Sequence, residues 1–218
     1  MIKTIQLVGG MMWVLAGICN GNTIGDGTDS FFTVASKGDV SAVKAFIANG
    51  ANVNAKDKVG RTPLMHAAWK GQTETLRLLL ANGANPNSEN KSGTTALMYA
   101  ARFGNLDAVR VLLEKGARVD ARTKTGLTPL MHAAWYGHAA VVRLLVEHGA
   151  DVNAQDEEGR IALIHATEGG NAEIVRILLV AGADRQVKDR NGRTALMIAE
   201  TRDRVEIAEL LRTTNLKP

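Results

Sequence analysis

Arg61-Thr62-Pro63-Leu64-Met65-His66-Ala67-Ala68 decides the fold, because nearly the same phrase returns at residues 94–101 and 127–134. Weaker copies stand at residues 162–166 and 194–199. A glycine precedes each copy, and the glycines recur every 33 residues without insertion or deletion, at Gly27, Gly60, Gly93, Gly126, Gly159 and Gly192. A fixed period of this length is typical of a solenoid, in which one small unit is stacked several times.

Each repeat is predicted to contain two helices. Thr62 is a good N-cap and Pro63 suits the first helical position, so a short first helix begins there. A glycine such as Gly71 follows after about ten residues and is expected to end that helix in a left-handed conformation. Leucines and valines then recur at spacings of three and four, which places them on one face of a second helix. A Gly-Ala pair such as Gly83-Ala84 leads into a polar, hairpin-like loop.

The repeated phrase resembles that of the ankyrin-repeat family, Gly-x-Thr-Pro-Leu-His-x-Ala-Ala followed by a leucine-rich helix and Gly-Ala-Asp-Val-Asn. The resemblance covers residues 27–212, since the period, the glycines and both helix phrases agree. It implies an all-α ankyrin-repeat solenoid of about six 33-residue helix-turn-helix repeats with hairpin-like loops. The histidine that follows leucine in the family phrase is replaced in this sequence. The side chain that usually makes the local hydrogen bonds at this position is therefore absent. Its place is taken by Met65, Met98, Met131, Ile164 and Met197.

The two ends of the array differ from its middle as capping repeats should. We expect an N-terminal capping repeat at 30–59, which has lost the Thr-Pro phrase, and a C-terminal capping repeat at 192–212. Charges on the last predicted helix can cover the open end. Four complete repeats are expected between the caps, at 60–92, 93–125, 126–158 and 159–191. A linker at 22–29 and a tail at 213–218 complete the predicted organisation.

The first 21 residues are unlike the repeats. Met1-Ile2-Lys3 is a short positive start, a mostly apolar run extends from Ile5 to Ile18, and small residues follow. This is the plan of a secretory signal peptide, so we expect an exported protein, periplasmic or secreted, with no membrane attachment once the peptide is removed. The apolar run falls short of the roughly 20 residues of a transmembrane helix, and a retained N-terminal anchor is the alternative. Cys19 is the single cysteine, so it has no intramolecular disulfide partner.

No pattern typical of catalysis or of metal binding is present in the sequence. His132 and His165 lie one repeat apart, about 10 Å for stacked helices, whereas a zinc ion needs its ligands at about 2 Å. The acidic run at 156–158 is typical of a solvated loop tip. There is no His-Glu-x-x-His, Gly-x-Ser-x-Gly or Gly-x-x-x-x-Gly-Lys motif. We therefore predict no enzyme activity, no catalytic residue, no cofactor and no metal; an enzyme with an unrecognised site is the alternative class.

The family resemblance implies that loop tips and the exposed ends of the first helices line a concave, partner-binding face. In this sequence those positions carry cations and aromatic rings, the side chains in which binding energy concentrates. Packing of the two tryptophans on the following repeat is an alternative role for those rings. The candidate partner-binding residues are Lys58, Arg61, Trp69, Lys70, Lys91, Arg102, Phe103, Lys124, Leu127, Trp135, Tyr136 and Glu157.

Charge narrows the class of partner. The chain is 45% apolar and 22% charged, as soluble proteins are, with a net charge of +4. Residues 93–125 carry a net +3 and residues 126–158 a net −4, so the concave face is expected to change sign between them. A polyanion such as a nucleic acid would be repelled by the second half, whereas a folded protein with a two-signed surface fits. We expect a monomeric, non-enzymatic protein-interaction module.

The resemblance to periplasmic ankyrin proteins that support a neighbouring enzyme implies a helper or scaffold role for this module. Both roles would use the concave face to hold a protein partner. A secreted effector that binds a host protein would use the same surface. The sequence therefore leaves the effector as the alternative.

The repeat at 159–191 breaks several local rules. Ile161 stands where Thr62 caps its helix, and Thr167 and Gly169 lower helix preference. We expect residues 159–212 to exchange amide hydrogens faster than residues 60–146. A new cap in Ile161→Thr would stabilise the chain by about 0.5–2 kcal/mol. If Ile161 is instead buried against the next repeat, the lost packing reverses that sign.

Overall fold

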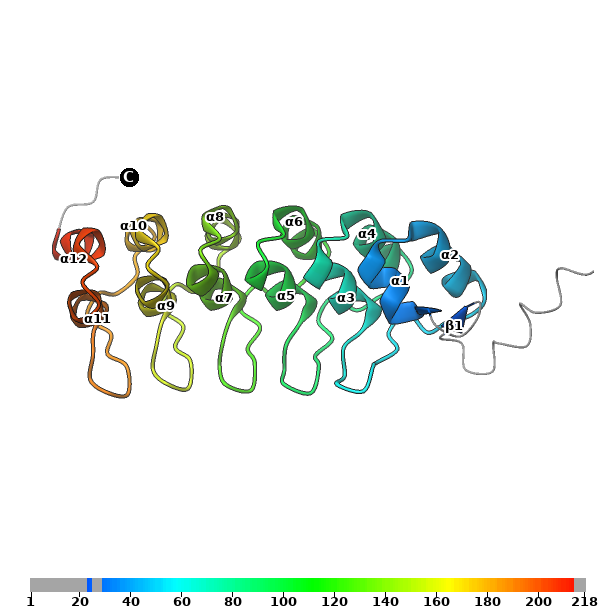
Figure 1. Ribbon diagram of the computed structural model, residues 1–218, viewed down its shortest axis with the longest axis horizontal. Helices are drawn as coiled ribbons and strands as arrows, with labels where there is room; N and C mark the ends of the chain where they lie inside the picture. Colours follow the sequence, from blue (N-terminus) through cyan, green and yellow to red (C-terminus); the bar gives the residue numbers. More distant parts are fainter. Residues whose placement is uncertain (1–22, 25–28, 214–218) are drawn as a thin grey trace, which may run out of the picture.

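The computed structural model describes residues 23–24 and 29–213, which form six pairs of short helices (Figure 1). The first helices of the pairs are α1 (Phe31–Lys37), α3 (Pro63–Lys70), α5 (Ala96–Arg102), α7 (Pro129–Tyr136), α9 (Ala162–Gly169) and α11 (Ala195–Thr201). The second helices are α2 (Val40–Ala48), α4 (Thr73–Ala81), α6 (Leu106–Glu114), α8 (Ala139–Glu147), α10 (Ala172–Val180) and α12 (Val205–Arg212).

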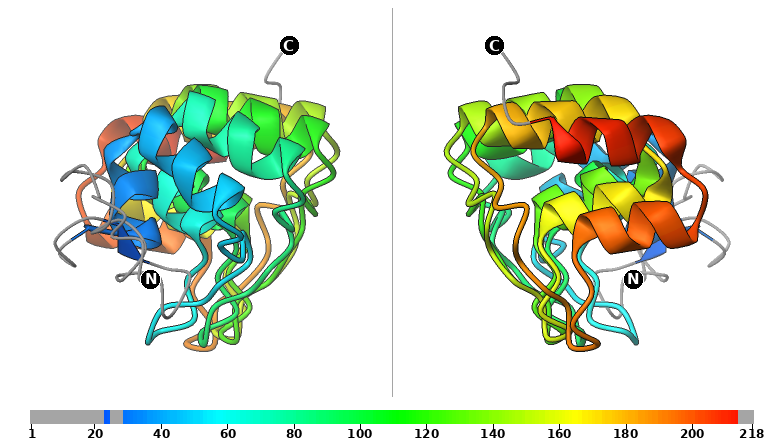
Figure 2. Two further views of the ribbon diagram at one scale, coloured as in Figure 1. Left: turned by 90° about the vertical axis from the view of Figure 1, so that its right-hand side faces the viewer. Right: turned by 90° about the vertical axis from the view of Figure 1, so that its left-hand side faces the viewer.

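The helix pairs stand side by side in a single row. The first helices make one layer, the second helices make another, and the loops between repeats all leave on the same side (Figure 1). Viewed along the row, the loops descend at an angle to the helices, so each repeat has an L-shaped outline (Figure 2). This architecture confirms the predicted all-α helix-turn-helix solenoid.

Every first helix after α1, with the exception of α9, has a threonine as its N-cap. The Thr62 hydroxyl accepts a hydrogen bond from the Met65 backbone N–H at 3.3 Å. In return, Met65 Sδ accepts the Thr62 backbone N–H at 3.4 Å, and residues 95–98 and 128–131 repeat this exchange. Sulfur is a weak acceptor, but it leaves no buried N–H without a partner. Methionine thus supplies a local hydrogen bond at the position of the family histidine.

Left-handed residues end the first helices, as the glycine spacing predicted. Gly71 has φ +69°, and its N–H donates to carbonyl oxygens of the last turn of α3. Gly104, Gly137 and Gly170 are also left-handed. Asp203 takes this place in the last repeat with φ +52°, and it is the one non-glycine residue with positive φ in the described part of the chain.

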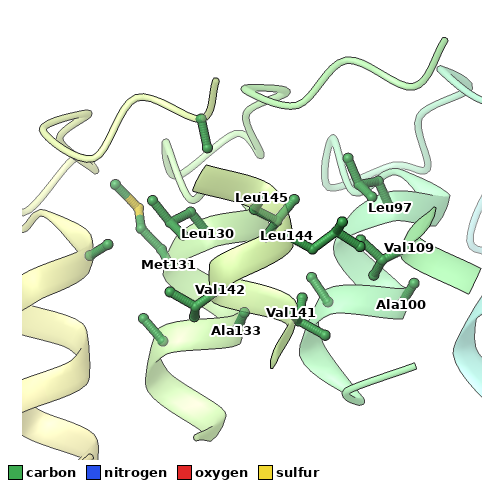
Figure 3. Packing of buried hydrophobic residues seen from close by; sticks show 14 of the residues in the cluster. Leu97, Ala100, Val109, Leu130, Met131, Ala133, Val141, Val142, Leu144 and Leu145 are labelled. Atoms are coloured by element: carbon green, nitrogen blue, oxygen red, sulfur yellow. The ribbon is translucent and has the colours of Figure 1, made fainter. Parts of the chain in front are cut away.

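Alanines form the contact between successive first helices. Ala100 of α5 and Ala133 of α7 are fully buried, and neither has a side chain beyond Cβ to hold the helices apart. Leucine and valine side chains of the second helices, such as Val109, Val142 and Leu145, close the core from the other layer (Figure 3). One continuous apolar core therefore runs the length of the array, and no single repeat could enclose it alone.

A polar side chain at the start of each second helix after α2 ties its repeat to the preceding one. Asn105 Nδ2 donates to the carbonyl oxygens of Ala68 and Trp69 at 2.8 and 3.1 Å. His138 Nε2 donates to the Arg102 carbonyl at 3.0 Å. These carbonyls belong to the last turn of a first helix, where no partner exists within the helix. Gln72, Asn171 and Arg204 occupy the same column and bond in the same way.

The ends of the array combine expected and unexpected features. In the segment predicted to be a linker, β1 (Thr23–Ile24) pairs antiparallel with β2 (Asp29–Ser30). At the other end, charged residues of α12 face solvent as predicted, but Met197 and Val205 are also exposed. The predicted signal peptide at 1–21 lies outside the described residues. No helix in the described ranges has the length and apolar character needed to cross a membrane.

The structure decides between the two interpretations of Ile161. Its side chain is fully buried, and α9 begins without a side-chain cap. Other contacts hold the far end of α9: the Thr167 hydroxyl donates to the Leu163 carbonyl at 2.8 Å. A Cβ on Gly169 would lie 2.5 Å from the Trp135 carbonyl oxygen, so glycine permits a close approach of α9 to α7. The faster exchange expected for residues 159–212 stays a prediction.

Ile161→Thr is expected to lower the free energy of unfolding by about 1 kcal/mol. The buried apolar side chain removed stabilises the fold by more than the new helix cap restores. Urea unfolding of the two proteins measures the difference. Ile161→Val is the matched control, because valine has the shape of threonine without the capping hydroxyl. An Ile161→Thr protein more stable than the wild type would show that the missing cap outweighs packing.

Candidate functional site

The candidate partner-binding residues fall on one surface of the solenoid. Lys58, Lys91, Lys124 and Glu157 occupy the same place on four successive loop tips and are exposed. Neighbouring loops are joined by a backbone hydrogen bond, such as Lys124 N–H to the Ser92 carbonyl at 3.0 Å. We call the surface formed by these loops and the loop-facing residues of α3, α5, α7 and α9 the concave face (Figure 2).

The aromatic rings of this face form a connected series across three repeats. Trp69 stacks against Tyr99 of the next repeat, with ring centres 6.3 Å apart, and lies 5.8 Å from Phe103. The Arg102 guanidinium lies 5.7 Å from the Phe103 ring and 5.1 Å from the Tyr136 ring. Cations over rings are attracted by the negative aromatic face. Side chains from different repeats therefore support one another across the surface.

These rings differ in how far they pack against other side chains and how far they are exposed to solvent. Trp69 is half-buried, and its ring also contacts the Arg61 and Lys70 cations at 5.5 and 4.9 Å. Trp135 packs edge-on against His165 of the next repeat, yet it is 38% exposed. Phe103 and Tyr136 are 44% and 45% exposed. The two tryptophans thus pack on the following repeat, as the alternative interpretation proposed, while Trp135 also presents surface to a partner.

Three of the five loops between repeats have an aspartate at a fixed place, Asp57, Asp156 or Asp189, and the loop before α5 has Asn90 there. Asp156 accepts the backbone N–H groups of Glu158 and Arg160 at 2.9 Å. Its other oxygen accepts from Arg160 Nε and His165 Nε2 at 3.0 and 2.9 Å. Burial opposes the charge on Asp156, but these hydrogen bonds outweigh burial and lower its pKa to about 2. The loop of Asp57, Arg61 and His66 has the same arrangement.

The loop before α7 lacks this arrangement. Thr123 stands in place of the aspartate and Leu127 in place of the arginine, with Thr123 Oγ1 accepting only the Leu127 N–H among backbone donors. His132 consequently has no carboxylate beside it, and no hydrogen bond to its ring is found within residues 29–213. Burial, with the nearby positive Arg102 and His165, lowers the pKa of His132 to about 4. The ring is neutral at physiological pH.

Two neighbouring cavities open beside His132. The first has a volume of about 270 Å³ and lies between α7 and the loop of Arg160. The second, about 340 Å³, lies between α5 and the loop at 123–127. Arg102, Leu127 and His132 line both, so the two cavities adjoin each other on the concave face. They occur at the loops before α5 and α7, where the aspartate and arginine of the remaining loops are both missing.

The expected change of charge sign is confined to the loop tips. Glu157 is exposed on the loop that follows Lys124, while Glu158 pairs with Arg190 at 3.1 Å. The linings of the two cavities include Lys91, Lys124, Arg102 and Arg160 but no acidic side chain. The second cavity is therefore positive, whereas Arg160 in the wall of the first cavity is paired with Asp156 and Glu168.

The sequence predicted the residues at the edge of this site better than the residues that line its interior. The candidate set contained Arg102, Leu127, Trp135 and Tyr136 but missed the cavity wall formed by Tyr99, Met131, His132, Arg160 and His165. A comparison of equivalent loop positions would have revealed the departure at Thr123 and Leu127. No cluster of three or more metal-ligating side chains occurs in the part of the chain that the structure describes.

The fold and the recess define a helical-repeat protein of the kind that presents a continuous binding surface. A family model described as ankyrin repeats matches three times, at residues 9–90, 80–156 and 151–217. The chain therefore belongs to the ankyrin-repeat family, whose repeats form protein–protein interaction modules. A search of curated proteins found no match.

His132 is expected to titrate near pH 4 in the folded protein. The pKa of an ordinary histidine is about 6.5, so the unfolded chain takes up its proton first as the solution is acidified. The corresponding stability is present above about pH 6.5 and is lost as the pH falls toward 4. NMR titration of His132 and urea unfolding at pH 7 and 5 test this.

His132→Tyr, which copies Tyr99 of the preceding repeat, should remove part of that pH dependence. The remainder is expected from His66, whose pKa burial also lowers. Arg102→Gln should raise the pKa of His132 by removing a nearby positive charge. A His132 resonance that titrates near pH 6.5 in the wild type would contradict the burial of its ring.

Proposed function

We propose that this chain is an exported, non-enzymatic binding module that holds a protein partner on its concave face as a helper or scaffold. The observation that carries the proposal is a group of exposed rings: Trp135 and Tyr136 line the first cavity, and Phe103 contacts Arg102, which lines both. Exposed aromatic side chains next to a recess are the usual anchors of protein interfaces. Family membership supports the general role, and the geometry supports the choice of face.

Charge supports a protein rather than a nucleic acid as the partner. The lysines at positions 91 and 124 are followed along the face by Glu157, so successive loop tips present opposite signs. A nucleic-acid backbone carries one sign throughout and gains most of its affinity from an unbroken row of cations. A folded protein can match a row of loop tips that carries both signs, and the change of sign also selects its register along the array.

Export is supported by the sequence of the first 21 residues. The Met1-Ile2-Lys3 start, the apolar run and the small residues after it match the order of regions in a secretory signal peptide. Removal of this segment would also remove Cys19 and leave a chain without cysteine. Such a chain is compatible with an oxidising compartment.

Trp135→Ala, Tyr136→Ala and Phe103→Ala are each expected to weaken partner binding by more than about 1 kcal/mol, because each removes an exposed ring at the recess. The partner is first captured from the native extract with the mature protein, and its affinity for each variant is then measured by calorimetry. Circular dichroism should show unchanged helix content.

Arg110→Ala is the matched control, since Arg110 is exposed on α6, in the other helix layer. It should leave partner affinity unchanged. Loss of binding in the Arg110 variant, with full binding by the three ring variants, would place the interface on the second helices instead.

Mass spectrometry of the protein from its native host should show a chain that lacks about its first twenty residues, because signal peptidases cleave after the small-residue region. Cell fractionation should place that shortened chain outside the cytosol. An intact Met1 in a cytosolic fraction would refute export while leaving the binding proposal standing.

A further inference from the structure

We infer that the two cavities around His132 form one site for an acidic peptide segment of the partner that carries a single large apolar side chain. This inference rests on the proposed function and adds the chemistry of the bound segment. It also assigns the two ends of the site different roles, with the apolar side chain beside Trp135 and the carboxylates beside Lys91 and Lys124.

The site exists because two neighbouring loops lack the aspartate and arginine of the others: Asn90 and Thr94 stand before α5, and Thr123 and Leu127 before α7. In the loop before α9, the Asp156 carboxylate binds both Arg160 and His165, so all three side chains are satisfied internally. In the loop before α7, Thr123 and Leu127 provide neither the anion nor the cation. His132 therefore faces both cavities. These cavities are the space that an aspartate at position 123 and an arginine at position 127 would fill.

The first cavity suits an apolar side chain. Its walls include Leu127, Met131, Trp135 and Tyr136, and its volume of about 270 Å³ can hold a leucine or a phenylalanine. The low pKa of His132 leaves its ring uncharged at neutral pH, so the ring does not oppose an apolar occupant.

The second cavity suits carboxylates. Lys91, Arg102 and Lys124 are its cations, and five hydroxyl side chains line it as further hydrogen-bond donors. No carboxylate in the described part of the chain pairs with Arg102, whose guanidinium contacts only rings in the interactions found for it. Planar guanidinium binds carboxylate in a two-pronged geometry, and tyrosine and phenylalanine rings already hold it in place.

The arrangement along the array also sets the order and spacing of the segment. Neighbouring first helices lie about 10 Å apart, which an extended peptide spans in about three residues. The acidic residues should therefore stand about three positions from the apolar one. Exposed Glu157 lies beyond the first cavity and would repel further acid there. The carboxylates are thus restricted to one side of the apolar residue.

The experiment selects peptides from a random dodecapeptide library displayed on phage, with the complete mature chain immobilised at low salt. Enriched sequences should share a large apolar residue with acidic residues about three positions to one side. A synthetic peptide of that consensus should lose at least tenfold in affinity when its acids become glutamines. Its affinity should also fall as salt is raised, because exposed charges carry part of the binding.

Two sets of variants locate the bound peptide. Arg102→Gln with Lys124→Gln should weaken it at least tenfold, while Arg110→Gln on the other layer should not. Thr123→Asp with Leu127→Arg rebuilds the arrangement of the loop before α9 and should close the site. In that variant, the new carboxylate should raise the pKa of His132 in NMR titration, which reports that the loop has formed as designed.

The outcomes separate this inference from the proposed function. Enriched peptides without acid, no enrichment at all, or equal binding by the loop-rebuilt variant would each overturn the acidic-peptide site. Competition by inorganic phosphate or heparin, with no loss when the acidic residues become glutamines, would assign the recess to another kind of anion and overturn it too. Partner binding that still depends on the exposed rings would in each case leave the proposed function intact. Partner binding insensitive to those rings would overturn both.

Discussion

The structure depends on how closely successive first helices pack through their alanines. Ala100 and Ala133 fill the contact between α5 and α7 without side chains that could vary in conformation, so the two helices have one well-defined separation and register. At Gly169 the approach is closer still, since even a Cβ would meet the backbone of Trp135. A repeat with larger residues here would have to move away from its neighbour, and the apolar core would open to water along the array.

This fixed register turns each position of the repeat into a column of side chains. Columns that face the next repeat are buried, and polar columns such as the one containing Asn105 and His138 satisfy carbonyls that the short helices leave free. Columns on the loops and on the loop-facing side of the first helices remain exposed. The solenoid consequently separates stability from recognition: substitutions in the exposed columns alter the surface while the stack stays the same.

The candidate site arises where one column changes its chemistry. Asp57 and Asp156 hold their loops with depressed pKa values, and each binds a histidine of the following helix. At Thr123 the same backbone turn is kept by a hydroxyl, which retains the loop but cannot neutralise a cation or hold a histidine. The loop therefore survives while its interior opens. Arg102, held by rings of two repeats, then faces a recess that contains no negative charge.

The sequence by itself determined the class of fold, the helix starts and the left-handed helix ends, because threonine caps, glycines and a constant period act locally and repeat. It also identified the face on which Trp135 and Tyr136 lie. Burial was decided only by the tertiary structure: Ile161 looks like a defective cap along the chain but lies in the core between repeats. The cavities were likewise decided by the stack, since Arg102, Leu127 and Arg160 belong to three different repeats and line the same cavity only when these repeats pack together. Local rules describe one repeat, whereas a site is made from several.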